Sequence, residues 1–410
     1  MTQPLRRNRD FTLLWTGLAV SVLGSRISAT AYPLLVLALT GSAADAGLVG
    51  FLATLPWLLF QLPGGALVDR WDRRRVLLVA DAVRGVALAS VVAALLLDRL
   101  ELPYLMAVAF LEGTLFVFAN LAEHAAIRHV VAREQLPDAL ARNEARVRGA
   151  GLLGQPIGGF LFDLGRALPF VADAVSYVIS FAMVTLIHSR FREEEPEERA
   201  ALGRLPAEIA EGVAWLWRQP FLRATAILVA GSNFMFMALT LILIVVVRNA
   251  GASGATVGLM LAGAGAGGVA GSLVAPWLQR RVTGRVVVIG ANWVWALSVP
   301  GMLVTQSPYV LGALYAAMAF VGPAWNVVIG AYQLAITPDR LVARVSSVET
   351  LVAYGAIPLG SLAGGLLTES LGGVTAIAVL AGWMGFLALA AAAAPSIRRA
   401  PPLAPATAGV

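Results

Sequence analysis

The stretch GALVDRWDRRR, residues 65–75, joins two long apolar segments of the chain, 46–68 and 76–97. It contains a glycine, the carboxylate Asp69 and four arginines. Glycine allows helices to pack closely, and a carboxylate beside arginines can meet cationic groups or the N-terminus of a helix. Because each flanking segment is long enough to cross a bilayer, this stretch predicts a charged turn between two membrane helices.

The composition of the whole chain favours a membrane protein. Hydrophobic residues make up 59 % of the 410 residues and charged residues only 13 %, whereas about a quarter of a soluble domain is charged. So few charges could not cover the surface of a soluble chain of this size. The absence of cysteine also excludes a disulfide-stabilised fold.

The apolar segments predict an all-α polytopic fold with twelve transmembrane helices. The predicted spans are 11–39, 46–68, 76–97, 103–123, 146–163, 168–187, 222–247, 254–277, 286–304, 309–335, 346–368 and 373–394. Residues 131–163 resemble residues 337–369 at an offset of about half the chain, which indicates an internal repeat. Two such repeats predict two pseudo-symmetric six-helix bundles.

Polar segments mark the expected boundaries between the helix bundles, the linker and the tail. We expect an N-terminal bundle over 1–188, a cytoplasmic linker over 189–220, a C-terminal bundle over 221–394 and a disordered tail over 395–410. Within the linker, residues 207–218 have apolar side chains on one face, which predicts an amphipathic helix at the membrane surface. Partner binding by this helix is the alternative interpretation.

The placement of the arginines predicts the orientation. All 30 basic residues are arginine, and most lie in alternate gaps between the apolar segments. This alternation follows the positive-inside rule with both termini cytoplasmic, so the positive charge serves orientation and not nucleic-acid binding. Helices in place of strands, together with an arginine-only composition rich in alanine and glycine, indicate a bacterial cytoplasmic membrane.

The absence of lysine also argues against hydrolysis of ATP by this chain. A P-loop needs a lysine to reach the nucleotide phosphates, so the chain is not expected to hydrolyse ATP. The three histidines show no metal-ligand spacing, and GAGAGG at residues 263–268 lies inside an apolar helix, where packing explains it better than dinucleotide binding. We therefore expect neither an enzyme nor a cofactor or metal site.

The turn at residues 65–75 resembles the loop signature between helices two and three of the major facilitator superfamily, although Asp72 stands where that family usually has glycine. RDFTLLW at 9–15, REQLPDA at 133–139 and EGVAWLWRQP at 211–220 resemble the twelve-helix branch that holds macrolide-efflux-type and enterobactin-exporter-type proteins. Related lysophospholipid carriers share much of this pattern. The resemblance implies the major facilitator fold and transport by alternating access.

The resemblance also implies two structural sites. One is a cytoplasmic gate formed by Gly65, Asp69, Arg70, Arg73 and Arg74. Asp81 and Arg84 lie one to two turns into helix three, close along the chain to these residues, and are expected to belong to the same gate. The other is a packing motif on helix five, where GQPIGG at residues 154–159 is similar to a signature of antiporters with its proline one place late. Its residues Gly154, Pro156, Gly158 and Gly159 would permit bending and close helix packing.

Ionisable residues inside spans are costly and are functional candidates. Arg26 lies near the middle of helix one and Glu112 near the middle of helix four, and both helices line the central cavity in the resembled superfamily. The two side chains are expected to neutralise one another, either for substrate and proton handling or as a structural pair. Further candidates for the substrate and proton pathway are Asn120, Glu123, Asn233 and Asn326.

The expected function is secondary active export of an amphipathic small molecule, such as a drug, antibiotic or siderophore, coupled to proton entry. Glu112 is the carboxylate expected to take the proton, since burial favours the neutral form of an acid. The expected partners are this small molecule, protons and the lipid bilayer, with no nucleic acid, and the chain is expected to be a monomer. A lysophospholipid carrier or lipid flippase of the same fold, or a non-transporting membrane scaffold, are the alternatives.

Overall fold

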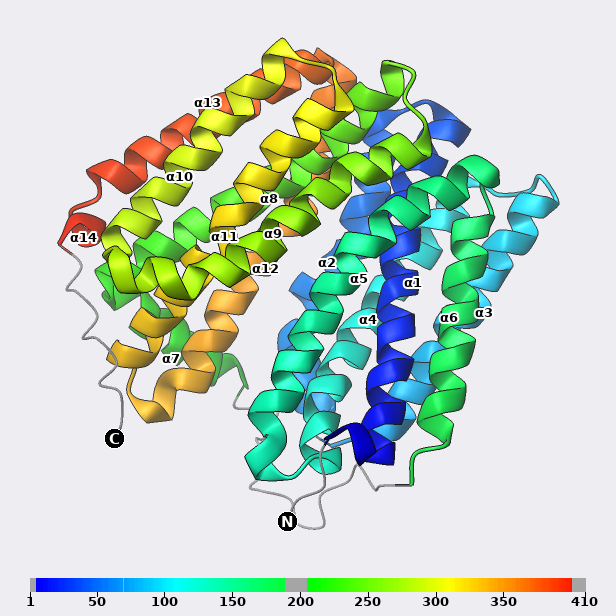
Figure 1. Ribbon diagram of the computed structural model, residues 1–410, viewed down its shortest axis with the longest axis horizontal. Helices are drawn as coiled ribbons and strands as arrows, with labels where there is room; N and C mark the ends of the chain where they lie inside the picture. Colours follow the sequence, from blue (N-terminus) through cyan, green and yellow to red (C-terminus); the bar gives the residue numbers. More distant parts are fainter. Residues whose placement is uncertain (1–4, 69, 189–204, 400–410) are drawn as a thin grey trace. The chain divides into compact units, whose positions relative to one another are not determined.

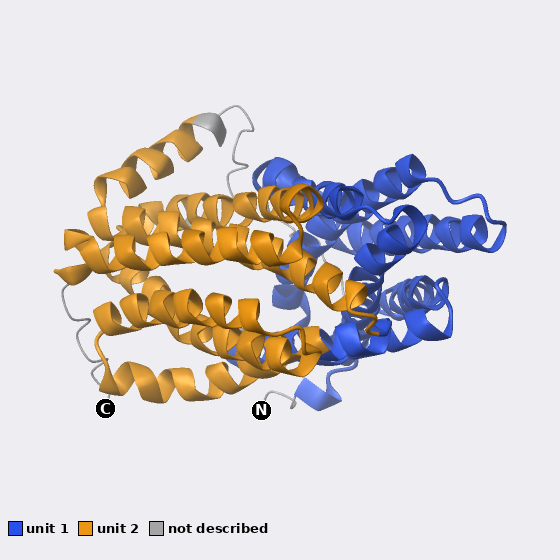
Figure 2. Cartoon of the chain, turned by 90° about the horizontal axis from the view of Figure 1, so that it is seen from above, with its two compact units in different colours: residues 1–205, 253–259 blue, residues 206–252, 260–410 orange. Residues whose placement is uncertain are grey.

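The computed structural model describes residues 5–68, 70–188 and 205–399, and these residues form helices without any strand. The chain divides into two compact units, residues 1–205 with 253–259 and residues 206–252 with 260–410 (Figure 2). The first unit contains α1 (Arg9–Thr40), α2 (Ala43–Val68), α3 (Arg73–Leu96), α4 (Leu102–Val130), α5 (Leu136–Leu164) and α6 (Leu168–Thr185), with the short 3-10 helices η1 (Leu5–Arg7) and η2 (Arg133–Gln135) (Figure 1).

The second unit contains the later helices, although the first turn of α9 and the residue before it are grouped with the first unit. These helices are α7 (Leu205–Arg218), α8 (Pro220–Asn249), α9 (Gly254–Arg281), α10 (Gly284–Gly301), η4 (Met302–Val304), α11 (Pro308–Ile336), α12 (Asp339–Leu371), α13 (Gly373–Ala393) and α14 (Pro395–Arg398). Each of the twelve predicted spans coincides with one long helix, so the predicted all-α class is confirmed.

Eleven helices of the described residues are long and apolar enough to cross a membrane. The exception among the predicted spans is α5, which begins at Leu136, ten residues before the predicted start at residue 146. Its first half carries Asp138, Arg142 and Glu144 and is nevertheless helical, with Ala139 buried. A hydropathy pattern detects only the apolar part of such a helix and therefore misses the polar turns that precede it.

Local side chains set where two of these helices begin. The Asn8 side chain accepts a hydrogen bond of 3.0 Å from the backbone N–H of Phe11 and caps α1. At the position where the resembled signature has glycine, Asp72 has φ −67° and accepts a bond of 2.9 Å from the backbone N–H of Arg74. Aspartate is a favourable residue at this position because its carboxylate satisfies N–H groups that lack a partner within the helix. Asp72 therefore begins α3 without the conformational freedom of glycine.

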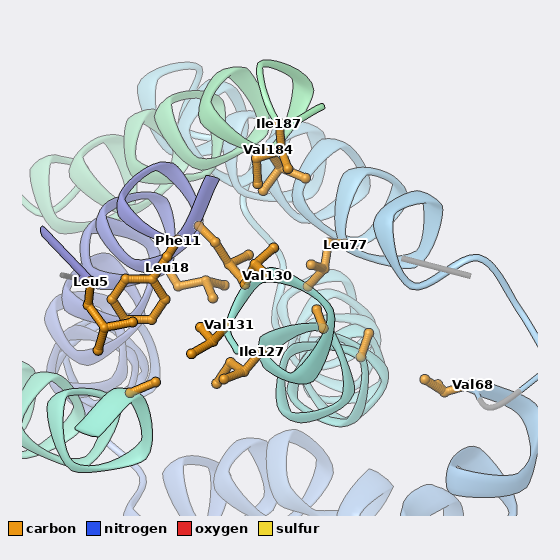
Figure 3. Close-up of a cluster of buried hydrophobic side chains, with 14 residues drawn as sticks. Leu5, Phe11, Leu18, Val68, Leu77, Ile127, Val130, Val131, Val184 and Ile187 are labelled. Atoms are coloured by element: carbon orange, nitrogen blue, oxygen red, sulfur yellow. The ribbon is translucent and has the colours of Figure 1, made fainter. Parts of the chain in front are cut away.

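An apolar cluster closes one end of the first unit, where α1 begins and where α4 and α6 end (Figure 3). Its labelled members are Leu5, Phe11, Leu18, Val68, Leu77, Ile127, Val130, Val131, Val184 and Ile187. They come from most helices of the unit, so the helix ends are held by burial of apolar surface. Above this end, α1 packs against α5 and α6, α3 packs against α4 and α6, and α2 packs against α4.

In the second unit, α8 packs against α12 and α13, and α10 packs against α11 and α13. The linker helix α7 is attached to α12 through Arg344, which contacts Glu211 and lies 3.3 Å from a carboxylate oxygen of Glu208. Gly212 lies against the backbone of the same arginine. An amphipathic helix at this place is thus tied to the start of α12 by charge as well as by apolar contact.

The prediction of disorder from residue 395 onward is wrong for the first residues of the tail. Pro395–Arg398 form the helical turn α14, in which the Ile397 side chain is fully buried. Proline favours the first position of a helix, and Ile397 adds apolar burial beside α8, α10 and α13. The rest of the predicted tail, residues 400–410, lies outside the described residues, as does the predicted linker segment 189–204.

Candidate functional site

The first unit buries an ion pair in its interior. An Oε1 atom of Glu112 on α4 lies 3.8 Å from the Nε atom of Arg84 on α3, and the two side chains are only 10 % and 6 % exposed. The Tyr32 hydroxyl of α1 donates a hydrogen bond of 3.0 Å to the other carboxylate oxygen. Three helices thus converge on one buried carboxylate.

This arrangement corrects the predicted partner of Glu112 and the predicted role of Arg84. Arg84 was expected in the cytoplasmic gate, and the structure places it beside Glu112, ten residues or about 15 Å along α3 from the gate residue Arg74. Arg26, the expected partner, has an exposed side chain, and its Cβ lies against Gly154 of α5. One sequence does not determine the rotation of a helix, so it identified the buried carboxylate but not its cation.

A second carboxylate lies nearby on α6. Asp173 is fully buried and accepts a hydrogen bond of 2.5 Å from the Ser28 hydroxyl of α1. Ser176 and Tyr177 of its own helix donate to it as well, at 3.2 and 3.5 Å. A buried carboxylate needs several donors because it has left the solvation of water.

Arg84 connects the two carboxylates. The guanidinium carbon lies 4.2 Å from the centre of the Tyr177 ring, a distance at which cation and ring attract one another. Its Nη2 donates to the Ser25 hydroxyl at 3.2 Å, and Ser25 lies 3.0 Å from the Tyr177 hydroxyl that bonds Asp173. A continuous chain of polar contacts therefore runs from Arg84 to Asp173.

A third carboxylate, Asp81, is buried one turn before Arg84 on α3 and interacts electrostatically with Arg84 and Asp173. Within the described residues, the Nε atom of Arg84 and the Oε1 atom of Glu112 lack a hydrogen-bond partner. We call this group the acid–arginine cluster; it consists of Arg84, Glu112, Asp173 and Asp81 with the hydroxyl side chains of Ser25, Ser28, Tyr32 and Tyr177.

Sequence reasoning overlooked Asp173, although a signal for it existed. The residue lies inside the predicted span 168–187, where an ionisable side chain is a functional candidate by position alone. Ser25 and Ser28 could not be recognised in that way, because a hydroxyl inside a membrane helix commonly bonds its own backbone. The structure shows that Ser28 faces Asp173.

Glu123, a second predicted pathway residue, belongs to a separate buried pair. It contacts the Arg146 guanidinium of α5 and accepts a hydrogen bond of 2.9 Å from the amide of Asn143. Asn120, one turn earlier on α4, contributes its backbone carbonyl to a contact of 2.8 Å with Nδ1 of His124. This second pair joins α4 to α5 near the apolar end of the unit.

The gate residues that can be placed hold α3 to its neighbours. Arg73 is buried, with its Nη1 atom 2.9 Å from Nε2 of His129 on α4. Arg74 donates to the backbone carbonyls of Val184 and Thr185 at 3.3 and 2.6 Å, where α6 ends and cations are favoured.

Two other predicted gate residues, Gly65 and Arg70, lie in the last turns of α2 and in the turn that follows it. Gly65 has open space where a Cβ would lie, and Arg70 is exposed. Asp69 lies outside the described residues.

Of the predicted amides in the second unit, Asn233 of α8 donates to the Ala353 carbonyl of α12 at 2.7 Å. Asn326 of α11 is exposed. The structure thus uses Asn233 as a link between helices and leaves Asn326 on a surface of the unit.

The predicted packing motif of helix five lies at close helix contacts. A Cβ added at Gly154 would lie 2.5 Å from the Cβ of Arg26, and one at Gly158 would collide with the Ile27 carbonyl of α1. Gly159 meets the backbone of Gly254, which opens α9 and belongs to the same unit. Pro156 lies inside α5 between these glycines. Close approach of α5 to α1 therefore requires glycine at Gly154 and Gly158, and its approach to the start of α9 requires glycine at Gly159.

The same end of α5 holds the first turn of α9 by a carboxylate. Asp163 accepts hydrogen bonds from the backbone N–H groups of Gly254 and Ala255, at 2.7 and 2.8 Å. A carboxylate at a helix N-terminus is favourable because it satisfies free N–H groups and meets the positive end of the helix dipole.

A glycine-to-alanine pair on α5 tests this packing. Gly158→Ala is expected to destabilise the protein by about 1–3 kcal/mol, because the new methyl group collides with the backbone of Ile27. Gly151→Ala on the same helix has open space around it and should stabilise by up to ~1 kcal/mol through helix propensity. Thermal unfolding of both purified variants measures the difference, and an equal response would contradict the packing role of Gly158.

Among the described residues no group of metal ligands comes together. The acid–arginine cluster instead gathers three acids, one guanidinium and hydroxyl groups among the described residues. Such a set inside a bundle of membrane helices is typical of proteins that move ions or solutes across a bilayer.

Comparison with known proteins agrees with this class. Residues 2–403 match the family described as transmembrane secretion effectors. The solved structure of the nucleoside transporter NupG superposes with a TM-score of 0.79 at 10 % identity, covering 94 % of this chain and 99 % of that one. A bacterial homologue of the iron transporter ferroportin, in its inward-facing state, superposes with a TM-score of 0.72 at 14 % identity, over 95 % and 99 % of the two chains.

Sequence relatives narrow the class further. The multidrug efflux pump Tap of Mycolicibacterium fortuitum is 28 % identical over 85 % of this chain and 87 % of its own length. Macrolide efflux protein A of Streptococcus pyogenes is 24 % identical over 88 % of this chain and 90 % of its own. The chain is a multi-pass membrane transporter with the major facilitator fold, and not an enzyme. It belongs to the transmembrane secretion effector family of the major facilitator superfamily.

Proposed function

We propose that this transporter exports an amphipathic small molecule from a bacterial cytoplasm in exchange for protons. The observation that carries the proposal is the buried contact between Glu112 and Arg84 inside the helices of the first unit. The similarity to a multidrug efflux pump and to a macrolide efflux protein supports the direction of transport and the class of substrate.

The contact supplies a means of proton coupling. An ionised Glu112 is stabilised by the positive charge of Arg84 and by the Tyr32 hydroxyl. A proton on Glu112 removes the attraction to Arg84, so protonation changes the charge balance among α1, α3 and α4. A transporter that alternates between two states can use such a change to favour one state over the other.

The orientation and location belong to the same proposal. The arginine pattern predicts both termini in the cytoplasm and a bacterial cytoplasmic membrane. In this orientation the apolar end of the first unit, with Arg73 and Arg74 nearby, faces the cytoplasm, as a cytoplasmic gate requires. We propose that a single chain carries out the whole cycle.

Everted membrane vesicles that contain the protein test the proposal. In these vesicles a pH gradient is established, and macrolides, cationic dyes and siderophores are added one at a time. A proton-coupled exporter is expected to dissipate the gradient when its substrate is present, and vesicles from cells without the protein serve as the control. No dissipation with any compound, together with faster movement of a labelled lysophospholipid between leaflets, would contradict small-molecule export and favour a lipid carrier.

A further inference from the structure

The acid–arginine cluster contains more acids than cations. As whole residues, Glu112, Asp173 and Asp81 are 8 %, 0 % and 6 % exposed, and Arg84, at 5 %, is the cation that the structure places among them. If all three acids were ionised, the interior of the first unit would carry an excess of negative charge. A buried charge without a partner is strongly unfavourable, and the group takes up a proton in preference.

We propose that Asp173 is a second proton-binding carboxylate of this transporter, and that Asp173 and Glu112 compete for the single guanidinium of Arg84. When Glu112 is protonated, Arg84 is available to Asp173, and when Asp173 is protonated, Arg84 is available to Glu112. The site thus binds a proton on one of two acids on different helices. This inference rests on the proposed proton coupling for its role in transport, although proton binding itself does not depend on it.

The geometry allows Arg84 to serve both acids. Its Nε atom faces Glu112 at 3.8 Å, while Nη2 donates to Ser25, which contacts the Tyr177 hydroxyl at 3.0 Å. That hydroxyl in turn lies 3.5 Å from Asp173. Since the Glu112 contact is longer than an ordinary charge-assisted bond, a small movement of the guanidinium can strengthen one interaction and weaken the other.

Each helix of the cluster contributes at least one titratable group. Tyr32 of α1 bonds Glu112, and Asp81 of α3 interacts with both Arg84 and Asp173. Tyr177 of α6 lies between Arg84 and Asp173. The tyrosines donate hydrogen bonds to the carboxylates, so they act as neutral partners, and Asp81 is the remaining acid that a test must separate from Asp173.

Hydrogen bonds make Asp173 the better stabilised of the two anions. It accepts from Ser28 at 2.5 Å and from Ser176 at 3.2 Å, whereas one oxygen of Glu112 has no hydrogen-bond partner among the described residues. Hydrogen bonds to a carboxylate favour its ionised form. The competition therefore favours one outcome, in which Asp173 stays ionised beside Arg84 and Glu112 takes the proton.

Infrared spectroscopy of the purified protein in lipid nanodiscs tests the inference, because protonated and ionised carboxyl groups absorb at different frequencies. Difference spectra between acidic and alkaline buffer are recorded for protein with ordinary aspartate and for protein with aspartate labelled by ¹³C at the side-chain carboxyl. In the wild-type protein, part of the protonated-carboxyl band is expected to shift with the label and part to remain. The isotope-sensitive intensity that Asp81→Asn keeps and Asp173→Asn loses is assigned to Asp173, because the other aspartates contribute equally to both variants.

The competition is tested by measuring the band of each acid in the variant that lacks the other acid. Glu112→Gln should weaken the isotope-sensitive band, since Arg84 is then free to hold Asp173 ionised, and Asp173→Asn should weaken the isotope-insensitive band of Glu112. The exposed Glu101→Gln is the matched control: it removes only its own contribution to the isotope-insensitive band and should leave the isotope-sensitive band unchanged. An isotope-sensitive band that Asp173→Asn leaves unchanged, or variants that each affect only their own band, would overturn the inference.

The vesicle assay separates this inference from the proposed function. If the infrared spectra show the expected competition between Asp173 and Glu112 but no compound drives proton movement, the proposal of proton-coupled export is contradicted and the two-acid site still stands. Substrate-driven proton movement without an infrared signal from Asp173 would do the reverse. The Asp173→Glu variant keeps a carboxyl group at this position, so it remains decisive if Asp173→Asn fails to fold: the contribution of residue 173 should then move from the isotope-sensitive to the isotope-insensitive part of the band.

Discussion

Replacement of Arg84 by glutamine is expected to destabilise the protein by about 3–5 kcal/mol, the range found when one partner of a buried ion pair is removed. The substitution leaves Glu112, Asp173 and Asp81 buried without their cation. It also removes the contact with the Tyr177 ring and the bond to Ser25. The apparent Tm of the purified protein in detergent should therefore fall markedly, and the yield of folded protein should fall with it.

Two further variants make this result specific to the cluster. Arg75→Gln, in the first turn of the same helix α3, removes a side chain that is 85 % exposed beside Asp72. Loss of such a surface pair changes stability by about 0–1 kcal/mol. Arg84→Gln combined with Glu112→Gln removes one positive and one negative charge together and should recover part of the lost stability. Equal apparent Tm values for Arg84→Gln and Arg75→Gln would contradict a buried electrostatic role of Arg84.

The helices of this protein could be predicted from its sequence because a bilayer sets the length and the apolar composition of a spanning helix. A span needs about twenty apolar residues, and every predicted span coincides with a helix. The errors lie at the ends, as in α5, where polar turns continue the helix beyond the apolar part. At residue 395, composition alone predicted disorder where burial of Ile397 forms another turn.

The site could be predicted only in part. Glu112 was recognised because an acid within a span is unusual, and the same reasoning applied to Asp173 would have found it. The partner of Glu112 was assigned wrongly, because pairing depends on which way each helix is turned, and one sequence contains no information about that rotation. Arg84 was assigned to the gate by its nearness in the chain to Arg74, whereas its side chain lies beside α4 and α6.

Glu112→Gln is expected to abolish substrate-driven proton movement while the protein remains folded. Glutamine has nearly the shape of glutamate and keeps an oxygen that can accept the hydrogen bond of Tyr32. Because the change removes one of the excess acids, Arg84 retains Asp173 and Asp81 as partners, and stability should stay near that of the wild type. Loss of transport with an unchanged apparent Tm would therefore reflect the lost proton site and not unfolding.

The measurement is dissipation of the pH gradient in everted vesicles by a compound that is active with the wild-type protein, compared at equal amounts of membrane-inserted transporter. Glu101→Gln, which removes an exposed acid at the start of the same helix, should retain the wild-type response. Binding of the compound to Glu112→Gln should persist, since the substitution blocks the coupling step and leaves the uncharged parts of the transporter unchanged. Full dissipation by Glu112→Gln would exclude Glu112 as the essential proton carrier, whereas joint loss in Glu112→Gln and Asp173→Asn would show that export needs both acids of the cluster.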